Sequence, residues 1–176
     1  MNRKTLPLVG ILAAMSLCLE LAVHFPVLSA APYLLYSPGD LPILIAAIVV
    51  SPAAGVAAAF ANATLFVMLT GQGGPWGALM HFIASGGMAF VVGWLYSKSK
   101  RLDASLFAGV LTRIALMVPL NLLVTPLYTG MTAKQVMQLI VPVIIPFNVI
   151  HGGLNSVLAF VLFAAAPNVF KLKGTR

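Results

Sequence analysis

Long runs of apolar residues, separated by short polar stretches, account for most of this chain. The runs cover 6–25, 41–50, 53–69, 78–96, 104–125 and 136–165. A helix of about 20 apolar residues spans the hydrocarbon core of a bilayer. The pattern therefore predicts an all-α integral membrane protein, with six transmembrane helices in a single bundle and one domain over 1–176. The second run is too short to cross a bilayer alone, so its helix is predicted to be short or sunken.

Prolines and capping residues mark where several of these helices begin or bend. Asp40 followed by Pro42 is typical of a helix start, with the aspartate as N-cap and the proline in the first turn. Pro52 separates the second run from the third. Pro142 and Pro146 interrupt the last run, which predicts a broken or bent helix because proline lacks an N–H donor.

Composition and net charge narrow the class of protein. Hydrophobic residues make up 61% of the chain and charged residues only 7%, whereas soluble domains contain about 25% charged residues. Little sequence is left over for a soluble catalytic domain. The net charge of +7 would suit a nucleic-acid-binding protein, but the placement of the charges argues against that class.

Eight of the ten basic residues fall where the positive-inside rule expects cytoplasmic loops and ends. They are Arg3, Lys4, Lys98, Lys100, Arg101, Lys171, Lys173 and Arg176. Six helices with this distribution put both termini in the cytoplasm. The other two basic residues are Lys134, in a predicted outer loop, and Arg113, within a span. Membrane topology thus explains the basic character, and no nucleic acid is expected as a partner.

Polar side chains recur at helical spacing within the apolar runs. Arg113 and Asn121 share one face of the fifth predicted helix. The shared face of the sixth holds Asn148, His151 and Asn155. These residues either hydrogen-bond neighbouring helices or, with His81, line a ligand pocket in the outer half of the bundle. We favour the pocket for the set, whereas Arg113, nearer the inner half, is expected to brace the bundle.

Motifs of the competing class, an intramembrane enzyme, do not occur in the sequence. There is no H-E-x-x-H or G-x-S-x-G motif, and the glycine-rich stretch 71–77 lacks the lysine and the following hydroxyl residue of a P-loop. The three carboxylates are few for an ion-coupled transporter with an acidic relay. We therefore expect no catalysis, no ATP hydrolysis, no metal site and no cofactor.

The chain resembles one family of membrane proteins over nearly its whole length, and the resemblance rests on five stretches. They are "YSPGDLP" (36–42), "SPAAGV" (51–56), "TGQGGPWGALMHFIAS" (70–85), "RIALMVPLNLLVTPLY" (113–128) and "IPFNVIHGGLNS" (145–156). The sequence is similar to the substrate-binding S components of energy-coupling factor (ECF) transporters, and within them to the riboflavin-specific branch. The most specific part is the arginine, asparagine and Pro-Leu-Tyr of the fifth helix followed by Pro-Phe-Asn in the sixth.

The resemblance implies a flavin pocket near the extracellular face of a multi-pass protein of the prokaryotic cell membrane. Together with the polar pattern, it assigns ligand binding to Tyr36, Asp40, His81, Asn121, Tyr128, Asn148, His151 and Asn155. Gly10 and Ala14, small residues four apart on the first helix, match the family's docking surface for a transmembrane coupling protein. That protein and two cytoplasmic ATPases would drive import, with riboflavin as transported ligand rather than cofactor.

Three polar positions depart from the family pattern. His151 stands where lysine is expected, His81 where asparagine is usual, and Ser37 where an acidic residue often follows Tyr36. A flavin ring needs an apolar slot with a few donors and acceptors, and asparagine supplies both. A phosphorylated flavin would prefer more cations near the mouth, where only Lys134 is obvious. The alternatives are an S component for thiamine, pantothenate, biotin or hydroxymethylpyrimidine, and then an intramembrane enzyme.

Overall fold

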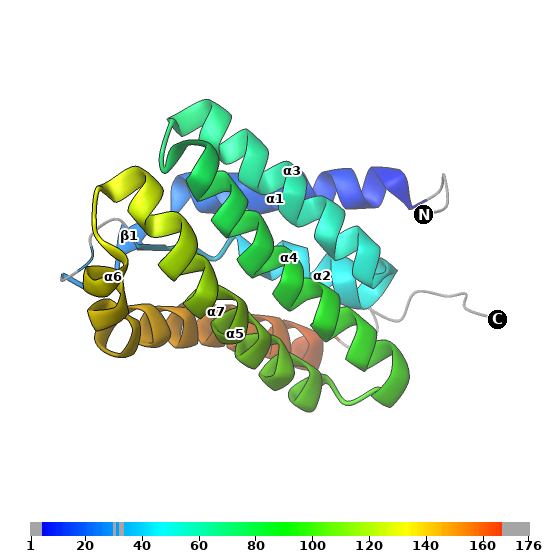
Figure 1. Ribbon diagram of the computed structural model, residues 1–176. Coiled ribbons are helices and arrows are strands. Elements are labelled where there is room, and N and C mark those ends of the chain that lie inside the picture. Colours follow the sequence, from blue (N-terminus) through cyan, green and yellow to red (C-terminus); the bar gives the residue numbers. More distant parts are fainter. Residues whose placement is uncertain (1–4, 30, 32–33, 167–176) are drawn as a thin grey trace.

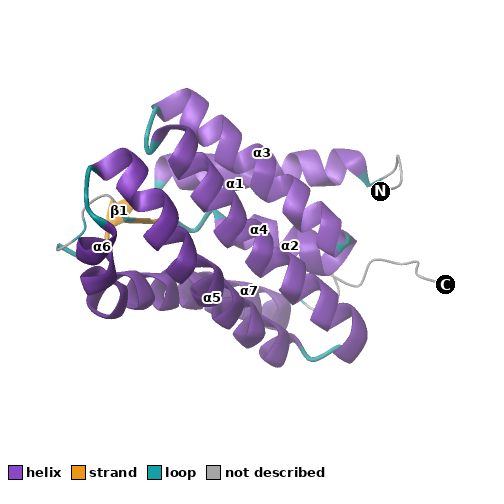
Figure 2. Ribbon diagram, in the orientation of Figure 1, coloured by secondary structure: helices purple, strands orange, loops and turns teal. Residues whose placement is uncertain are grey.

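The computed structural model describes residues 5–29, 31 and 34–166 of the chain. Its elements are α1 (Leu6–Ala22), β1 (Phe25–Pro26), β2 (Leu35–Tyr36), α2 (Asp40–Ile45), η1 (Ala46–Val50), α3 (Pro52–Thr70), α4 (Gly74–Ser99), α5 (Leu102–Thr129), α6 (Ala133–Leu139), η2 (Ile140–Ile144) and α7 (Ile145–Ala165). Here η denotes a π-helical turn. Figure 2 shows that helices form nearly all of the described chain.

The described helices join into six continuous segments, the number that the apolar pattern predicts. The segments are α1, α2 with η1, α3, α4, α5, and α6 with η2 and α7. Four of them are long and apolar enough to cross a membrane: Pro52–Thr70, Gly74–Ser99, Leu102–Thr129 and Ala133–Ala165. Leu6–Ala22 and Asp40–Val50 are shorter apolar helices. The prediction of a helical membrane bundle is confirmed.

The short second helix lies inside the bundle, as predicted. Ile43 and Ala46 have no exposed surface. A methyl group added to Gly93 of α4 would lie 2.6 Å from the carbonyl oxygen of Ala47, and one added to Gly55 of α3 would lie 2.6 Å from the Ala47 side chain. Glycine at both positions lets α3 and α4 approach the short helix closely, which is how small residues pack membrane helices.

The segment between α1 and α2 contains a short strand pair that the sequence analysis did not predict. α1 ends at Ala22 instead of continuing to 25, and Phe25–Pro26 pairs antiparallel with Leu35–Tyr36. Pro26 cannot continue a helix, and two residues per strand are too few to give an alternating pattern. The pair holds the residues that follow α1 beside those that precede α2.

Other helix ends also differ from the prediction. α4 begins at Gly74, inside the stretch predicted as a loop, and α5 continues to Thr129 before Gly130, with φ of 75°, ends it. The predicted break near Pro142 is present, because the last helix changes to the π-helical turn Ile140–Ile144 there. A proline inside a helix removes one backbone donor, and a π-helical turn accommodates that loss.

Asp40 is not the N-cap of α2, contrary to the prediction. Gly39 holds that position, and no side chain caps the helix. Asp40 is the first helical residue and is 1% exposed. Its carboxylate forms an ion pair with Arg113 of α5, so a tertiary interaction takes the place of the local cap.

The two ends of the bundle differ in charge. The start of α1, the α4–α5 turn and the end of α7 lie at one end, whereas the β1–β2 pair, the α3–α4 turn and α6 lie at the other (Figure 1). Lys98, Lys100 and Arg101 are all at the α4–α5 turn, and Lys134 is in α6. The remaining basic residues of the topology argument, Arg3, Lys4, Lys171, Lys173 and Arg176, lie outside the described residues.

Candidate ligand-binding site

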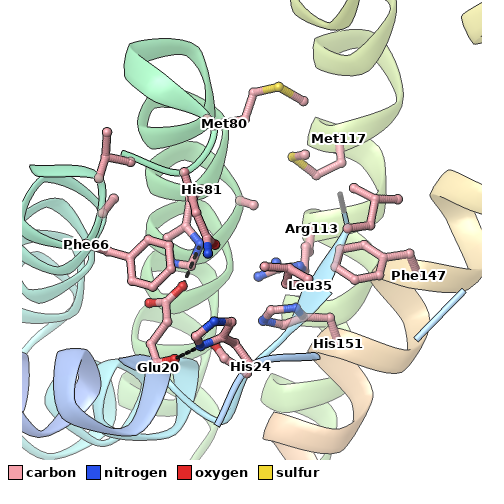
Figure 3. Close-up of a pocket in the computed structure, with 18 of the residues that line it drawn as sticks. Glu20, His24, Leu35, Phe66, Met80, His81, Arg113, Met117, Phe147 and His151 are labelled. Carbon is pink, nitrogen blue, oxygen red and sulfur yellow. Dashed lines mark hydrogen bonds and ion pairs between the residues drawn. The ribbon is translucent and has the colours of Figure 1, made fainter. Parts of the chain in front are cut away.

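A cavity of about 510 Å³ opens between the helices near the end that carries the α3–α4 turn. Helices α1, α3, α4, α5 and α7 line it, together with the segment around β2. Figure 3 shows side chains from these elements converging on one space. Ligand pockets for organic molecules have volumes of roughly 300–1,000 Å³, so the cavity is large enough for a small heterocyclic ligand.

Most of the cavity wall is apolar. The apolar lining residues are Leu34, Leu35, Ala63, Phe66, Val67, Met80, Ala84, Met117 and Phe147. The polar and charged lining residues are Glu20, His24, Ser37, Gln72, His81, Arg113, Tyr128 and His151. An apolar slot with a few convergent polar groups is typical of a site for a largely apolar ligand with polar edges.

Arg113 holds four helices together at one side of the cavity. It is 3% exposed, and its Nη1 donates to the Asp40 carboxylate at 2.6 Å and to the Ser85 hydroxyl at 3.2 Å. Its Nε donates to the amide oxygen of Asn148 at 3.1 Å. These four residues, the Arg113 network, join α5 to α2, α4 and α7. A buried arginine in a membrane needs such partners, and these contacts are those expected of a brace. Arg113 also lines the cavity, although the sequence placed it nearer the inner half.

His151 lies between this network and the cavity. Its Nε2 is 3.4 Å from the Asp40 carboxylate, and its ring packs edge-on to the rings of Tyr36 and Phe147, each centroid 5.4 Å away. Neither ring nitrogen has a hydrogen-bond partner among the described residues. Burial raises the pKa of the Tyr36 phenol, and the negative charge of Asp40 raises it further. The Tyr36 hydroxyl therefore remains neutral.

A second polar group lies across the cavity, and of its members only His81 was assigned to ligand binding from the sequence. The Glu20 carboxylate accepts a hydrogen bond of 2.6 Å from the amide of Asn62, and its other oxygen lies 3.7 Å from Nδ1 of His81. We call Glu20, Asn62 and His81 the Glu20 cluster. His24 accompanies it through a 2.9 Å contact between its Nδ1 and the backbone oxygen of Glu20. The sequence contained one signal for this group, because Asn62 is a polar residue in the middle of an apolar helix.

The residues assigned to ligand binding from the sequence fall into two groups. His81, Tyr128 and His151 line the cavity. Tyr36, Asp40, Asn121, Asn148 and Asn155 do not line it, although each contacts a residue that does. Ligand contact remains a prediction for all eight.

The three asparagines in this set share one local interaction. Each side-chain amide donates to the carbonyl oxygen four residues earlier: Asn121 to Met117 at 2.8 Å, Asn148 to Ile144 at 2.8 Å and Asn155 to His151 at 3.0 Å. Asparagine often makes such bonds within a helix, in competition with tertiary contacts. These amides therefore have fewer donors left for a ligand than the sequence pattern suggested.

Gly10 and Ala14, the predicted docking residues, lie on an outer face of α1. Both are exposed, and a methyl group added to Gly10 would meet no atom within 4 Å. The bundle itself thus leaves room for a closely packed helix along this face. Whether a partner uses it stays a prediction.

The chain matches one protein family over almost its whole length. The model of the family described as "ECF-type riboflavin transporter, S component" matches residues 1–167. The riboflavin transporter RibU of Staphylococcus aureus (strain TCH60) is 30% identical over 181 residues, covering 97% of this chain and 94% of that protein. The riboflavin transporter FmnP of Bacillus subtilis (strain 168) is 29% identical over 175 residues, covering 93% and 92%.

A solved structure has the same fold. The structure described as "Structure and mechanism of the S component of a bacterial ECF transporter" superposes with a TM-score of 0.82, at 26% sequence identity, over 98% of this chain and 100% of that one. The similarity therefore covers the helices that line the cavity as well as those that form the outer faces of the bundle.

Proposed function

This chain belongs to the family of ECF-type riboflavin transporter S components, and on that premise we propose that its cavity captures riboflavin at the outer face of the cell membrane. The captured ligand is then delivered by a separate coupling module, and the chain performs no catalysis of its own. The observation that carries this proposal is the cavity itself, which combines an apolar wall with polar groups at two opposite sides.

The distribution of charge supports the outward orientation of the site. The cavity lies near the α3–α4 turn, and Lys98, Lys100 and Arg101 lie at the opposite end of the bundle. Basic turns stay on the cytoplasmic side of a membrane. This orientation gives the cavity access to the outside and puts both termini in the cytoplasm.

The two polar sides of the cavity suit the two parts of riboflavin. We assign the isoalloxazine ring to the side formed by His151 and Phe147, where an aromatic wall meets a histidine whose nitrogens have no partner among the described residues. In this arrangement Asp40 and Asn148 act through Arg113 and His151, which they hold in place. The ribityl chain then extends toward α1 and α4.

Coupling to a membrane partner would use the face of α1 that carries Gly10 and Ala14. Both residues are exposed and small, so a partner helix can approach the backbone there. The 176 residues contain no P-loop motif, so we assign ATP hydrolysis to separate cytoplasmic ATPases. The complete importer would contain this subunit, a coupling protein and those two ATPases.

Equilibrium binding to the purified subunit tests the proposal. Flavin fluorescence should be quenched on titration into the protein, because a bound ring lies against aromatic side chains, and neither ATP nor a partner should be needed. Thiamine, pantothenate, biotin and hydroxymethylpyrimidine should not compete. A protein that leaves riboflavin fluorescence unchanged but binds one of these four would retain the architecture and refute the ligand.

A further inference from the structure

The three carboxylates of the chain have three different environments. Asp103 is on the surface, with its side chain 63% exposed beside Arg101. Asp40 is buried and neutralised by Arg113 at 2.6 Å. Glu20 is the one that lines the cavity, and its side chain is 7% exposed. Among the described residues, no lysine or arginine forms an ion pair with Glu20.

One oxygen of the Glu20 carboxylate accepts a hydrogen bond within the protein, and the other can accept one from a ligand. Oε2 accepts the hydrogen bond from Asn62, which fixes the carboxylate between α1 and α3. Oε1 lies 3.7 Å from Nδ1 of His81, which is beyond hydrogen-bond distance. Nε2 of His81 has no hydrogen-bond partner among the described residues. Figure 3 shows Glu20 and His81 directed toward one another at the edge of the cavity, on the side away from His151.

We propose that Glu20 and His81 bind the hydroxyl groups of the ribityl chain and exclude a phosphate group from that position. The inference rests on the proposed function, since it concerns the same cavity and the same ligand class. It makes the Glu20 cluster the determinant of specificity for a neutral flavin with a free hydroxyl chain.

The chemistry of the cluster suits a polyhydroxyl chain. A carboxylate accepts hydrogen bonds from hydroxyl groups, and bonds to an ionised acceptor are roughly twice as strong as neutral ones. An acidic residue recognises ribose hydroxyls in the same way in dinucleotide-binding folds. With the proton on Nδ1 facing Glu20, Nε2 of His81 is an acceptor for a further hydroxyl. The ligand supplies the donors that both acceptors lack.

The same charge opposes a phosphate. A phosphate monoester carries about −1.5 to −2 charges at neutral pH, and like charges within a poorly hydrated cavity repel strongly. Arg113 lines the cavity, but its charge is already matched by Asp40. The side of the cavity at Glu20 is therefore negative, and a flavin phosphorylated at the end of its ribityl chain meets that charge.

Three ligands and two isosteric variants test the inference. The ligands are riboflavin, FMN, which adds a phosphate to the ribityl chain, and lumiflavin, which lacks that chain. The variants are Glu20→Gln and the matched control Asp103→Asn, which removes a carboxylate from the surface. Glu20→Gln should fold, because Asn62 Oδ1 has no hydrogen-bond partner among the described residues and can accept from the new amide after a flip. Dissociation constants are measured for the purified full chain.

Glu20→Gln should weaken riboflavin binding by about 10- to 100-fold, the effect of losing a charged hydrogen bond. Lumiflavin affinity should change by less than about twofold. Wild-type protein should bind riboflavin at least about tenfold more tightly than FMN, and the ratio should fall toward one in Glu20→Gln, since the repulsion is removed. Asp103→Asn should leave all three affinities unchanged.

If the Glu20 cluster only stabilises the fold, Glu20→Gln should not distinguish between the three flavins. Equal losses for riboflavin, FMN and lumiflavin in Glu20→Gln would overturn the inference, and so would an unchanged riboflavin affinity. If that variant does not fold, His81→Gln provides the same comparison, with a riboflavin loss of about tenfold expected and lumiflavin again spared. Wild-type protein that binds no flavin at all would refute the proposed function instead, so the two failures are distinguishable.

Discussion

Substituting one partner of the Arg113–Asp40 ion pair should destabilise the bundle far more than substituting both partners together. The pair joins α5 to α2 across 73 positions of sequence, with the two side chains only 4% and 2% exposed. Arg113→Leu leaves the Asp40 carboxylate buried, with no ion-pair partner among the described residues other than His151, at 3.4 Å. Asp40→Asn leaves the guanidinium with neutral partners, Ser85 and Asn148.

The magnitude follows from the burial of the pair. Breaking a buried ion pair by removing one partner costs about 3–5 kcal/mol, whereas replacing both partners with neutral residues is often close to neutral. Each single variant should therefore lose about 3–5 kcal/mol of unfolding free energy, and the double variant Asp40→Asn/Arg113→Leu should lose less than either. In Arg113→Leu, the free energy of riboflavin binding to the folded protein should change less than the free energy of unfolding, because the arginine acts mainly by holding the helices together.

Reversible unfolding in mixed micelles, followed by tryptophan fluorescence, measures these changes. The exposed pair Arg101–Asp103, at 3.5 Å, is the matched control, and its double-mutant cycle should show little or no coupling. The reasoning is refuted if the losses of Asp40→Asn and Arg113→Leu simply add in the double variant. In that case the pair does not hold α2 against α5.

The other predictions concern the docking face and the asparagine of α5. Gly10→Leu and Ala14→Trp should abolish ATP-driven uptake in cells while leaving riboflavin affinity within about twofold of wild type. The control Leu123→Trp, at a position of α5 that is 70% exposed, should change neither uptake nor affinity. Normal uptake by both α1 variants would show that this face is not the docking surface. Asn121→Leu should weaken riboflavin binding by about tenfold or more in a calorimetric titration, because the bond to Met117 uses only one of the two N–H donors of the amide. Lost stability with an affinity change below about threefold would instead confine this amide to its contacts with Met117 and Thr125.

The sequence was sufficient to predict the six helical segments, because each is an apolar run that a polar stretch, a glycine or a proline separates from the next. It also indicated that Arg113 needs a partner. It did not identify Asp40 as that partner, since a local pattern for a helix cap and a tertiary ion pair both place an aspartate at the start of a helix. Glu20 and Asn62 are likewise 42 positions apart in the sequence, so their contact produces no helical periodicity that could reveal it.

The polar stripes on the last two long helices were less informative than their spacing suggested. Spacing predicts which residues share a helix face, but an asparagine on that face can satisfy its amide within its own helix. Asn121 does so with one N–H, and Met117, one turn earlier, lines the cavity. All three histidines of the chain line the cavity, and one of them, His24, also contacts the carbonyl oxygen four residues earlier.

Filling the cavity tests most directly whether riboflavin binds there. Ala63 of α3 lines the cavity and is 2% exposed, whereas Ala57 on the same helix faces outward. In equilibrium dialysis with purified protein, Ala63→Trp should weaken riboflavin binding by at least about 100-fold, because the indole occupies the space of the ligand, while Ala57→Trp should bind as wild type does. Riboflavin binding of wild-type strength by folded Ala63→Trp would contradict the account.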